Sequence, residues 1–222
     1  MERRLNQDAW ISFRTKDGIG IAVSDGLGSK SLSNFGSRAA CRAVRLAAKN
    51  TENERRVLST EHVASQIKSF WLDALGPIDP NEAGATCLFA YTNSGDFVVG
   101  ALGDGCIAVI SRDNSIKVLE VDKSRDFLNS TNALSPKTQV TNWRLAKYPA
   151  RDVEAVIIMS DGIADDLVDV PGFAREVCLK VQCLPDFVVT RHLRTMLGSW
   201  NVPKHSDDKS IACLIRRRHV EL

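Results

Sequence analysis

Short, mostly apolar runs separated by turn signals recur along the chain. Runs of four to seven such residues bounded by Gly, Asp or Asn are typical of buried β-strands. Hairpin-type turns at residues 93–96 and 103–105 separate successive runs, which makes the joined strands antiparallel. We expect strands at residues 19–24, 86–91, 97–102, 107–110, 153–159 and 210–215.

Two longer segments have the spacing of amphipathic helices. In residues 37–49 the alanines fall on one side and the basic residues on the other, and residues 61–75 repeat the pattern before Gly76 and Pro77 end it. Two further helices are expected at about 173–181 and 187–197.

The order of these elements favours an α+β layered fold over a doubly wound parallel one, because the hairpin-joined strands are antiparallel and the helices come in pairs. Residues 122–147 are polar and lack periodicity, so we predict a long loop or flap there, a length that is often functional. We expect a single domain over residues 1–222, with a flexible tail at 216–222.

Composition is that of an ordinary globular domain: 222 residues, 44% hydrophobic, 25% charged and a net charge of +2. This charge is too small to imply a nucleic-acid or membrane partner. The apolar runs are far shorter than the roughly 20 residues of a transmembrane helix. The six cysteines are scattered and no CxxC pair occurs, which argues against a zinc site and favours free thiols in a reducing, cytoplasmic compartment.

Acidic residues stand where the predicted strands end. Asp25, Asp104 and Asp161 each follow an apolar run and precede a glycine, and Asp207 and Asp208 precede the last run. If these strand ends converge, the carboxylates share a small volume and repel one another, so they require protons or cations. Two hard divalent cations about 3.5–4 Å apart satisfy such ligands and can activate a water for attack on phosphorus. Each Asp-Gly alone is a common turn, so the prediction depends on the whole set.

Seven short segments occur in a specific order over about residues 3 to 215. They are residues 6–9, with Arg3 five residues before Asp8, then 22–29, 33–40, 84–86, 102–105, 160–163 and 208–210. This order resembles the protein phosphatase 2C family, and most closely its compact bacterial branch. The resemblance implies a four-layer α-β-β-α sandwich with two central antiparallel sheets flanked by helix pairs. It also implies a metal-dependent serine/threonine phosphatase that uses Mn²⁺ or Mg²⁺.

By position in these motifs, the resemblance implies a set of metal ligands. Asp25 would bridge two metal ions, and the carbonyl of Gly26 would bind one of them. Asp161 and Asp208 would hold the other ion. Asp165 would bind a possible third ion, with Asp166 as the rival for that role.

The same resemblance implies roles around the metal ions. Asp8 and Asp104 would orient metal-bound waters, and Arg3 would bind the substrate phosphate through its forked guanidinium, with Arg4 as an alternative. The family usually has an edge strand ahead of this arginine, and only two residues precede Arg3 here, so either the sequence is truncated or its start is unusually short. Two other positions also depart from the family: Gln7 stands in place of a more familiar Glu, and Leu27 replaces a histidine of some eukaryotic members.

The resulting hypothesis is a bacterial, cytoplasmic, monomeric protein phosphatase. It would hydrolyse phosphoserine and phosphothreonine in a protein substrate with a cognate kinase, using a water activated by two metal ions. Two alternatives stay open. One is a non-catalytic binding module that keeps the fold, which Gln7 and Leu27 favour and the retained acidic cluster disfavours. The other is a phosphohydrolase of a small phosphorylated molecule, because the predicted flap has no motif that selects a substrate.

Overall fold

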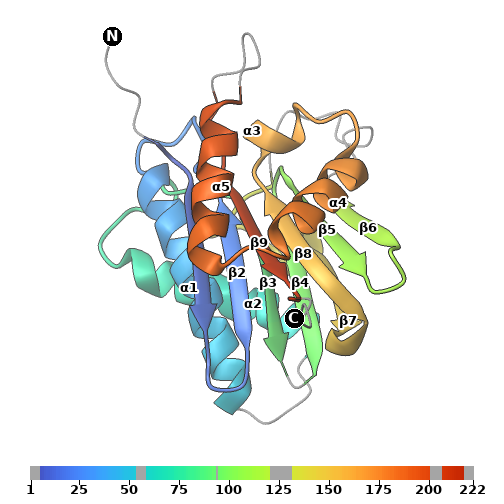
Figure 1. Cartoon of the computed structure of the whole chain (residues 1–222). Helices are drawn as coiled ribbons and strands as arrows, with labels where there is room; N and C mark the ends of the chain where they lie inside the picture. Colours follow the sequence, from blue (N-terminus) through green and yellow to red (C-terminus); the bar gives the residue numbers. More distant parts are fainter. Residues whose placement is uncertain (1–5, 54–58, 94, 121–131, 201–206, 218–222) are drawn as a thin grey trace.

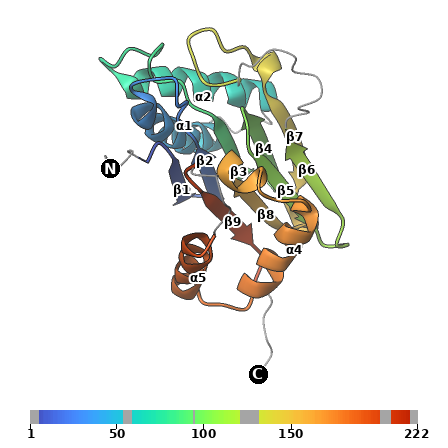
Figure 2. The ribbon, with the colours of Figure 1, turned by 90° about the horizontal axis from the view of Figure 1, so that it is seen from above.

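The computed structural model describes residues 6–53, 59–93, 95–120, 132–200 and 207–217. Two antiparallel sheets lie face to face between two helical layers (Figures 1 and 2). The strands are β1 (Ala9–Arg14), β2 (Ile19–Ser24), β3 (Cys87–Asn93), β4 (Asp96–Leu102), β5 (Cys106–Ser111), β6 (Ile116–Glu120), β7 (Arg144–Pro149), β8 (Val153–Met159) and β9 (Ile211–Ile215). The α-helices are α1 (Ser33–Asn53), α2 (Thr60–Leu75), α3 (Asp161–Ala164), α4 (Val170–Val181) and α5 (Asp186–Gly198).

Every strand pairs antiparallel with its neighbours. The first sheet has the order β1-β2-β3-β4-β7, and the second has the order β6-β5-β8-β9. The registers place Val23 beside Leu88 between β2 and β3, and Cys106 beside Met159 between β5 and β8. The chain passes from the first sheet to the second between β4 and β5, through the turn at residues 103–105.

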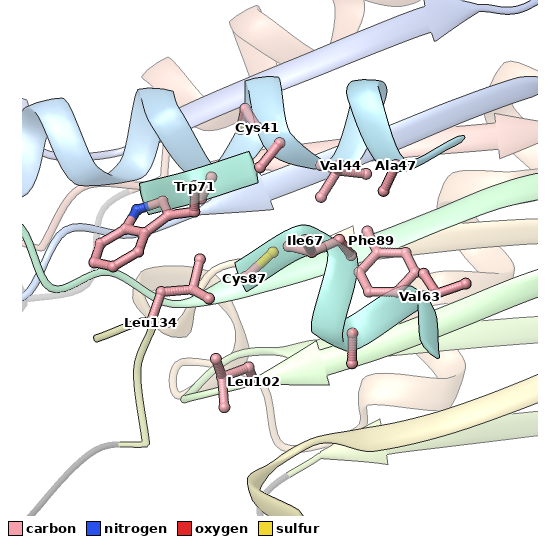
Figure 3. Close-up of a cluster of buried hydrophobic side chains, with 14 of the residues drawn as sticks. Cys41, Val44, Ala47, Val63, Ile67, Trp71, Cys87, Phe89, Leu102 and Leu134 are labelled. Carbon is pink, nitrogen blue, oxygen red and sulfur yellow. The ribbon is translucent and has the colours of Figure 1, made fainter. Parts of the chain in front are cut away.

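Three apolar clusters hold the four layers together. The middle cluster lies between the sheets, because alternate side chains of each strand point inward. The second packs α1 and α2 on the outer face of the first sheet (Figure 3), and the third packs α4 and α5 on the second sheet. In the α1–α2 cluster the fully buried Trp71 donates its indole N–H to the carbonyl of Gly36 at 3.1 Å.

The predicted α+β sandwich is confirmed, and the six predicted strands and four predicted helices are present. Three strands were not predicted, at residues 9–14, 116–120 and 144–149. All three are edge strands in the sheet order, and their exposed polar side chains interrupt the continuous apolar runs by which the buried strands were recognised.

The prediction of a loop over all of residues 122–147 was wrong, because β7 starts at Arg144 and pairs with β4. Residues 132–143, which precede β7, are also held by contacts with the rest of the fold. Leu134 is fully buried and forms a bridge with Ala85, and Lys68 of α2 donates to the carbonyls of Pro136 and Thr138. Residues 121–131 of the predicted flap lie outside the described residues.

At the other end of the chain, the N–H of Arg216 donates to the carbonyl of Glu154 at 2.8 Å and so extends the pairing of β9 with β8 by one residue. Residues 218–222 of the predicted tail lie outside the described residues. Within the part of the chain that the structure describes, no helix is long and apolar enough to cross a membrane.

Candidate metal centre

Strand direction brings the predicted aspartates to one edge of the sandwich. Because neighbours run antiparallel, the starts of β1, β3, β5 and β9 share this edge with the ends of β2, β4 and β8. It is the upper edge in Figure 1, where α3 lies. The residues at this edge are Asp8 just before β1, Asp25 just after β2, Asp104 between β4 and β5, Asp161 just after β8, and Asp208 shortly before β9.

The backbone of Asp25 is fixed by Thr86, the residue directly before β3. The Asp25 N–H donates to the Thr86 hydroxyl at 2.8 Å, and the Thr86 N–H donates to the Asp25 carbonyl at 2.8 Å. The Ser24 hydroxyl donates to the Thr86 carbonyl at 2.5 Å. The next residue, Gly26, is buried and forms a bridge with Ala85. Thr86 therefore positions the backbone of Asp25. The sequence analysis identified the motif that contains Thr86 but did not predict this role.

Gln7 links the Asp25 turn to Asp208 across the two sheets. Its N–H donates to Asp208 Oδ2 at 2.8 Å, and its carbonyl accepts from the N–H of Gly26 at 3.2 Å. Its side-chain Nε2 donates to the hydroxyl of Ser33 at 2.7 Å, at the start of α1. The departure from the family's Glu is thus accommodated by a local hydrogen bond.

Asp104 lies in a turn between two glycines with positive φ, Gly103 at 90° and Gly105 at 97°. Such angles favour glycine. A Cβ on Gly105 would lie 2.7 Å from the carbonyl oxygen of Met159 and 3.4 Å from the backbone nitrogen of Asp161. Close packing on glycine therefore holds the Asp104 turn against the end of β8.

The segment that contains Asp208 packs on the first turn of α3. The N–H of Ser160 donates to the Ser210 carbonyl at 3.0 Å, and the Ser210 N–H donates to the Ser160 hydroxyl at 3.0 Å. A Cβ on Gly162 would lie 2.2 Å from the Asp208 carbonyl oxygen, so only glycine permits this approach. The Asp161 carboxylate accepts from the N–H of Gly162 at 2.7 Å.

The two candidates for a third metal ion have different surroundings. Asp166 is buried, accepts from the indole N–H of Trp200 at 2.9 Å and lies 3.6 Å from the ammonium of Lys209. Asp165 instead lines a cleft of about 670 Å³ together with Asp104. This difference favours Asp165 over Asp166 as the residue that faces a ligand.

Burial and mutual repulsion perturb the carboxyl groups at this edge. Burial raises the pKa of Asp25 to about 9, with further increases from a hydrogen bond to Asp8 and from the charges of Asp8, Asp161 and Asp208. Burial also raises the pKa of Asp8; contacts with Asp25 and with the hydroxyls of Ser210 and Ser160 oppose this, and the charge of Asp208 adds to it. For Asp161, burial raises the pKa, the Gly162 N–H lowers it, and the charges of Asp8, Asp165 and Asp104 raise it. The protonation of each of these carboxyls therefore depends on the charges of the others.

The chemistry of this group fits a hard divalent cation. Both carboxylate oxygens of Asp8 are buried and have no hydrogen-bond partner of normal geometry in the described structure. Oxygen donors of this kind are those that Mg²⁺ and Mn²⁺ prefer. Among the described residues no group of three or more Asp, Glu, His or Cys side chains lies close enough together to hold a metal ion as the side chains stand. The two findings are compatible, because charges interact over longer distances than the roughly 2.0–2.6 Å of a metal–oxygen bond.

Arg3 and its alternative Arg4 lie outside the described residues. Five of the predicted site aspartates, Asp8, Asp25, Asp104, Asp161 and Asp208, thus meet at one edge with Gly26, and Asp165 lies in the adjoining cleft. The fold is thus a four-layer sandwich with a group of acidic residues held at the strand ends of one edge.

Comparison with known families agrees with this description. Residues 2–198 match the family model PP2C_2, described as Protein phosphatase 2C. The chain belongs to the protein phosphatase 2C family, and the resemblance read from the motifs is confirmed. Asp208 lies beyond the matched residues, so its assignment depends on its motif and on its place beside Gln7 and Gly162.

Solved structures with this fold have low sequence identity to the chain. RsbX in complex with magnesium has 17% identity and a TM-score of 0.59, covering 96% of this chain and 88% of that one. Stp1 from Staphylococcus aureus has 15% identity and a TM-score of 0.64, covering 97% and 91%. The catalytic domain of PstP in complex with two manganese ions has 14% identity and a TM-score of 0.58, covering 96% and 92%.

At such identities these structures demonstrate the shared fold. No curated protein sequence gives a significant match to the chain. Membership of the family supports a metal-dependent serine/threonine phosphatase in general.

Proposed function

We propose that this chain hydrolyses phosphoserine and phosphothreonine in protein substrates, with two Mn²⁺ or Mg²⁺ ions at the acidic edge. Asp25 would bridge the ions, Asp161 and Asp208 would bind one of them, and the Gly26 carbonyl the other. The observation that best supports this is the Asp8 carboxylate, which lies beside three further carboxylates and whose two buried oxygens have no hydrogen-bond partner of normal geometry among the described residues. A buried anionic group of this kind is costly unless protons or cations neutralise it.

Bound cations would offset the negative charge, lower the pKa of a water and polarise the phosphoryl oxygens. Asp8 and Asp104 would accept hydrogen bonds from water and so orient it for in-line attack. Thr86 and Gln7 would keep the Asp25 turn and the Asp208 carboxylate in place through the hydrogen bonds described above.

A water nucleophile, without a phosphoenzyme, agrees with the state of the nearby hydroxyls. Ser24 and Ser160 precede Asp25 and Asp161, but both are buried. The Ser24 hydroxyl donates to the Thr86 carbonyl, and the Ser160 hydroxyl accepts from a backbone N–H. Both side chains are thus engaged with the backbone inside the fold, where a phosphorylated residue would not reach them.

Two further roles depend on motif position and on the cleft. Arg3 would bind the substrate phosphate and stabilise its charge in the transition state. Asp165 would bind an accessory cation, because it lines the cleft beside Asp104. The same cleft would receive the phosphorylated residue.

The test compares a phosphothreonine peptide with small phosphate monoesters in the presence of Mn²⁺. We expect kcat/KM to be higher for the peptide, and we expect Asp161→Ala to abolish turnover while Asp73→Ala, an exposed change on α2, does not. Preference for a small phosphorylated molecule would replace the proposed substrate class. A folded wild-type protein without turnover on either substrate would favour a non-catalytic binding module.

A further inference from the structure

We propose that Lys209 is a positioning residue that fixes the Asp208 segment against α3 through the buried carboxylate of Asp166. This inference rests on the proposed function, because it takes Asp208 as a metal ligand. It goes further by naming the contact on which the affinity for the metal ion depends.

The ammonium group of Lys209 contacts both the backbone of its own segment and a carboxylate that follows α3. Its Nζ lies 3.6 Å from Oδ2 of Asp166, on the residues that follow α3, and 3.4 Å from the carbonyl oxygen of Asp207. Asp208 is the residue between Asp207 and Lys209. The side chain of Lys209 therefore connects the backbone immediately before Asp208 to α3.

Burial makes this contact stronger than a surface ion pair. The side chain of Asp166 is 1% exposed and that of Lys209 is 12% exposed. Removing one partner of a buried pair leaves a charge without compensation, which is far more costly than breaking an exposed pair. The indole N–H of Trp200 donates to the same Asp166 oxygen and holds the carboxylate in place. Asp166 is thus a fixed anchor for Lys209.

Other contacts fix only part of the segment. The paired hydrogen bonds between Ser160 and Ser210 hold its end, and the close approach of Gly162 holds the carbonyl of Asp208. The carboxylate itself accepts from the N–H of Gln7. Lys209 adds the contact to the carbonyl before Asp208, so the backbone is held on both sides of the proposed ligand.

The same geometry argues against Lys209 as a group that binds substrate phosphate. Its ammonium is directed to Asp166 and to a backbone carbonyl, and it is nearly enclosed. Its effect on catalysis would therefore pass through the position of Asp208. Partners that orient metal ligands typically contribute about 10- to 100-fold to metal affinity.

The test is a direct titration of the purified protein with Mn²⁺ by calorimetry, alongside activity as a function of Mn²⁺. Lys209→Met is expected to weaken Mn²⁺ binding about 10- to 100-fold. At saturating Mn²⁺, kcat is expected to stay close to the wild-type value, because mass action refills the site. Lys209→Arg keeps the charge and is expected to recover most of the affinity.

Two further variants separate positioning from folding. The double variant Asp166→Asn/Lys209→Met removes both charges of this pair, keeps an acceptor for Trp200, and should fold yet bind Mn²⁺ as weakly as Lys209→Met alone. The matched control is Lys147→Met, which breaks an ion pair of 2.9 Å with Asp96 at the far end of β4. It is expected to leave Mn²⁺ binding unchanged.

Each outcome has one meaning. Mn²⁺ affinity of the folded double variant within twofold of the wild type would overturn the positioning role of Lys209 and leave the proposed function intact. A wild-type protein that binds no Mn²⁺ would refute the proposed function, and this role with it. Equal losses in Lys209→Met and Lys147→Met would show that the effect does not depend on the contact with Asp166, and would also overturn the proposal.

Discussion

Replacing Asp25 with Asn tests the electrostatics of the acidic edge without depending on turnover. The substitution keeps the size of the side chain and removes its charge. Burial and the neighbouring carboxylates raise the pKa of Asp25 to about 9 in the folded protein, whereas an aspartate in an unfolded chain titrates near 3.9. Without metal ions, we therefore expect Asp25→Asn to stabilise the protein at neutral and alkaline pH.

The sign follows from proton binding. Between the two pKa values the folded protein holds a proton that the unfolded chain has released, so wild-type stability falls as pH rises through this window. At pH 8, about four units above 3.9 and at about 1.4 kcal/mol per unit, the upper bound is about 5.6 kcal/mol. Because Asp8, Asp161 and Asp208 share the repulsion and water reaches part of the group, we expect about 2 kcal/mol.

Urea denaturation in EDTA, followed by tryptophan fluorescence, measures this difference. The variant is expected to exceed the wild type in unfolding free energy at pH 8 and to match it near pH 4.5. Excess Mn²⁺ should reverse the order, because a ligand at 100 times its Kd stabilises the wild type by about 2.7 kcal/mol. The control Asp73→Asn, on the exposed face of α2, should change stability by less than about 0.5 kcal/mol at either pH.

Two results would refute this reasoning. One is a metal-free Asp25→Asn protein that is less stable than the wild type at pH 8. The other is a difference between the two proteins that does not change with pH. Either result would mean that Asp25 is charged without penalty in the folded protein.

Further predictions address the turn, the core, the thiols and the charge of the site. Gly105→Ala should destabilise the protein more than Gly95→Ala, as thermal unfolding would show. Both glycines have a positive φ, 97° and 90°, but a new Cβ on residue 105 would lie 2.7 Å from a backbone oxygen, whereas one on residue 95 meets no described atom within 4 Å. Ile67→Ala in the α1–α2 cluster should cost about 2–5 kcal/mol in urea denaturation. A thiol reagent should modify the exposed Cys183 of the native protein before any of the four buried cysteines, as peptide mapping would show. Gln7→Glu should tighten Mn²⁺ binding in a calorimetric titration by adding a negative charge to a residue whose N–H contacts Asp208, and unchanged affinity would contradict this.

The position of the acidic residues could be predicted from the sequence because it depends on local rules. Apolar runs that end in Asp-Gly define strand ends, and antiparallel pairing places alternate ends at one edge. Asp25, Asp104 and Asp161 follow these rules, and the structure places all three at that edge. Their roles as metal ligands and water-orienting groups stay predictions.

Other features could not be predicted because they depend on contacts between distant segments. The pairing of Lys209 with Asp166 joins the 208–210 segment to a residue that follows the 160–163 segment, and the spacing of these segments gives no sign of it. The β7 strand was hidden because Arg144 and Lys147 break the apolar pattern of an edge strand. The choice between Asp165 and Asp166 also required the structure, since adjacent residues differ only in what surrounds them.

The most direct test of the central claim is the release of inorganic phosphate from a phosphothreonine peptide, with and without Mn²⁺, by the wild type and by Asp161→Ala. The account predicts release that requires Mn²⁺ in the wild type and disappears in Asp161→Ala while circular dichroism shows that the variant is folded. Release that is the same without Mn²⁺, or that persists in Asp161→Ala, would contradict a metal-dependent site at this edge of the sandwich.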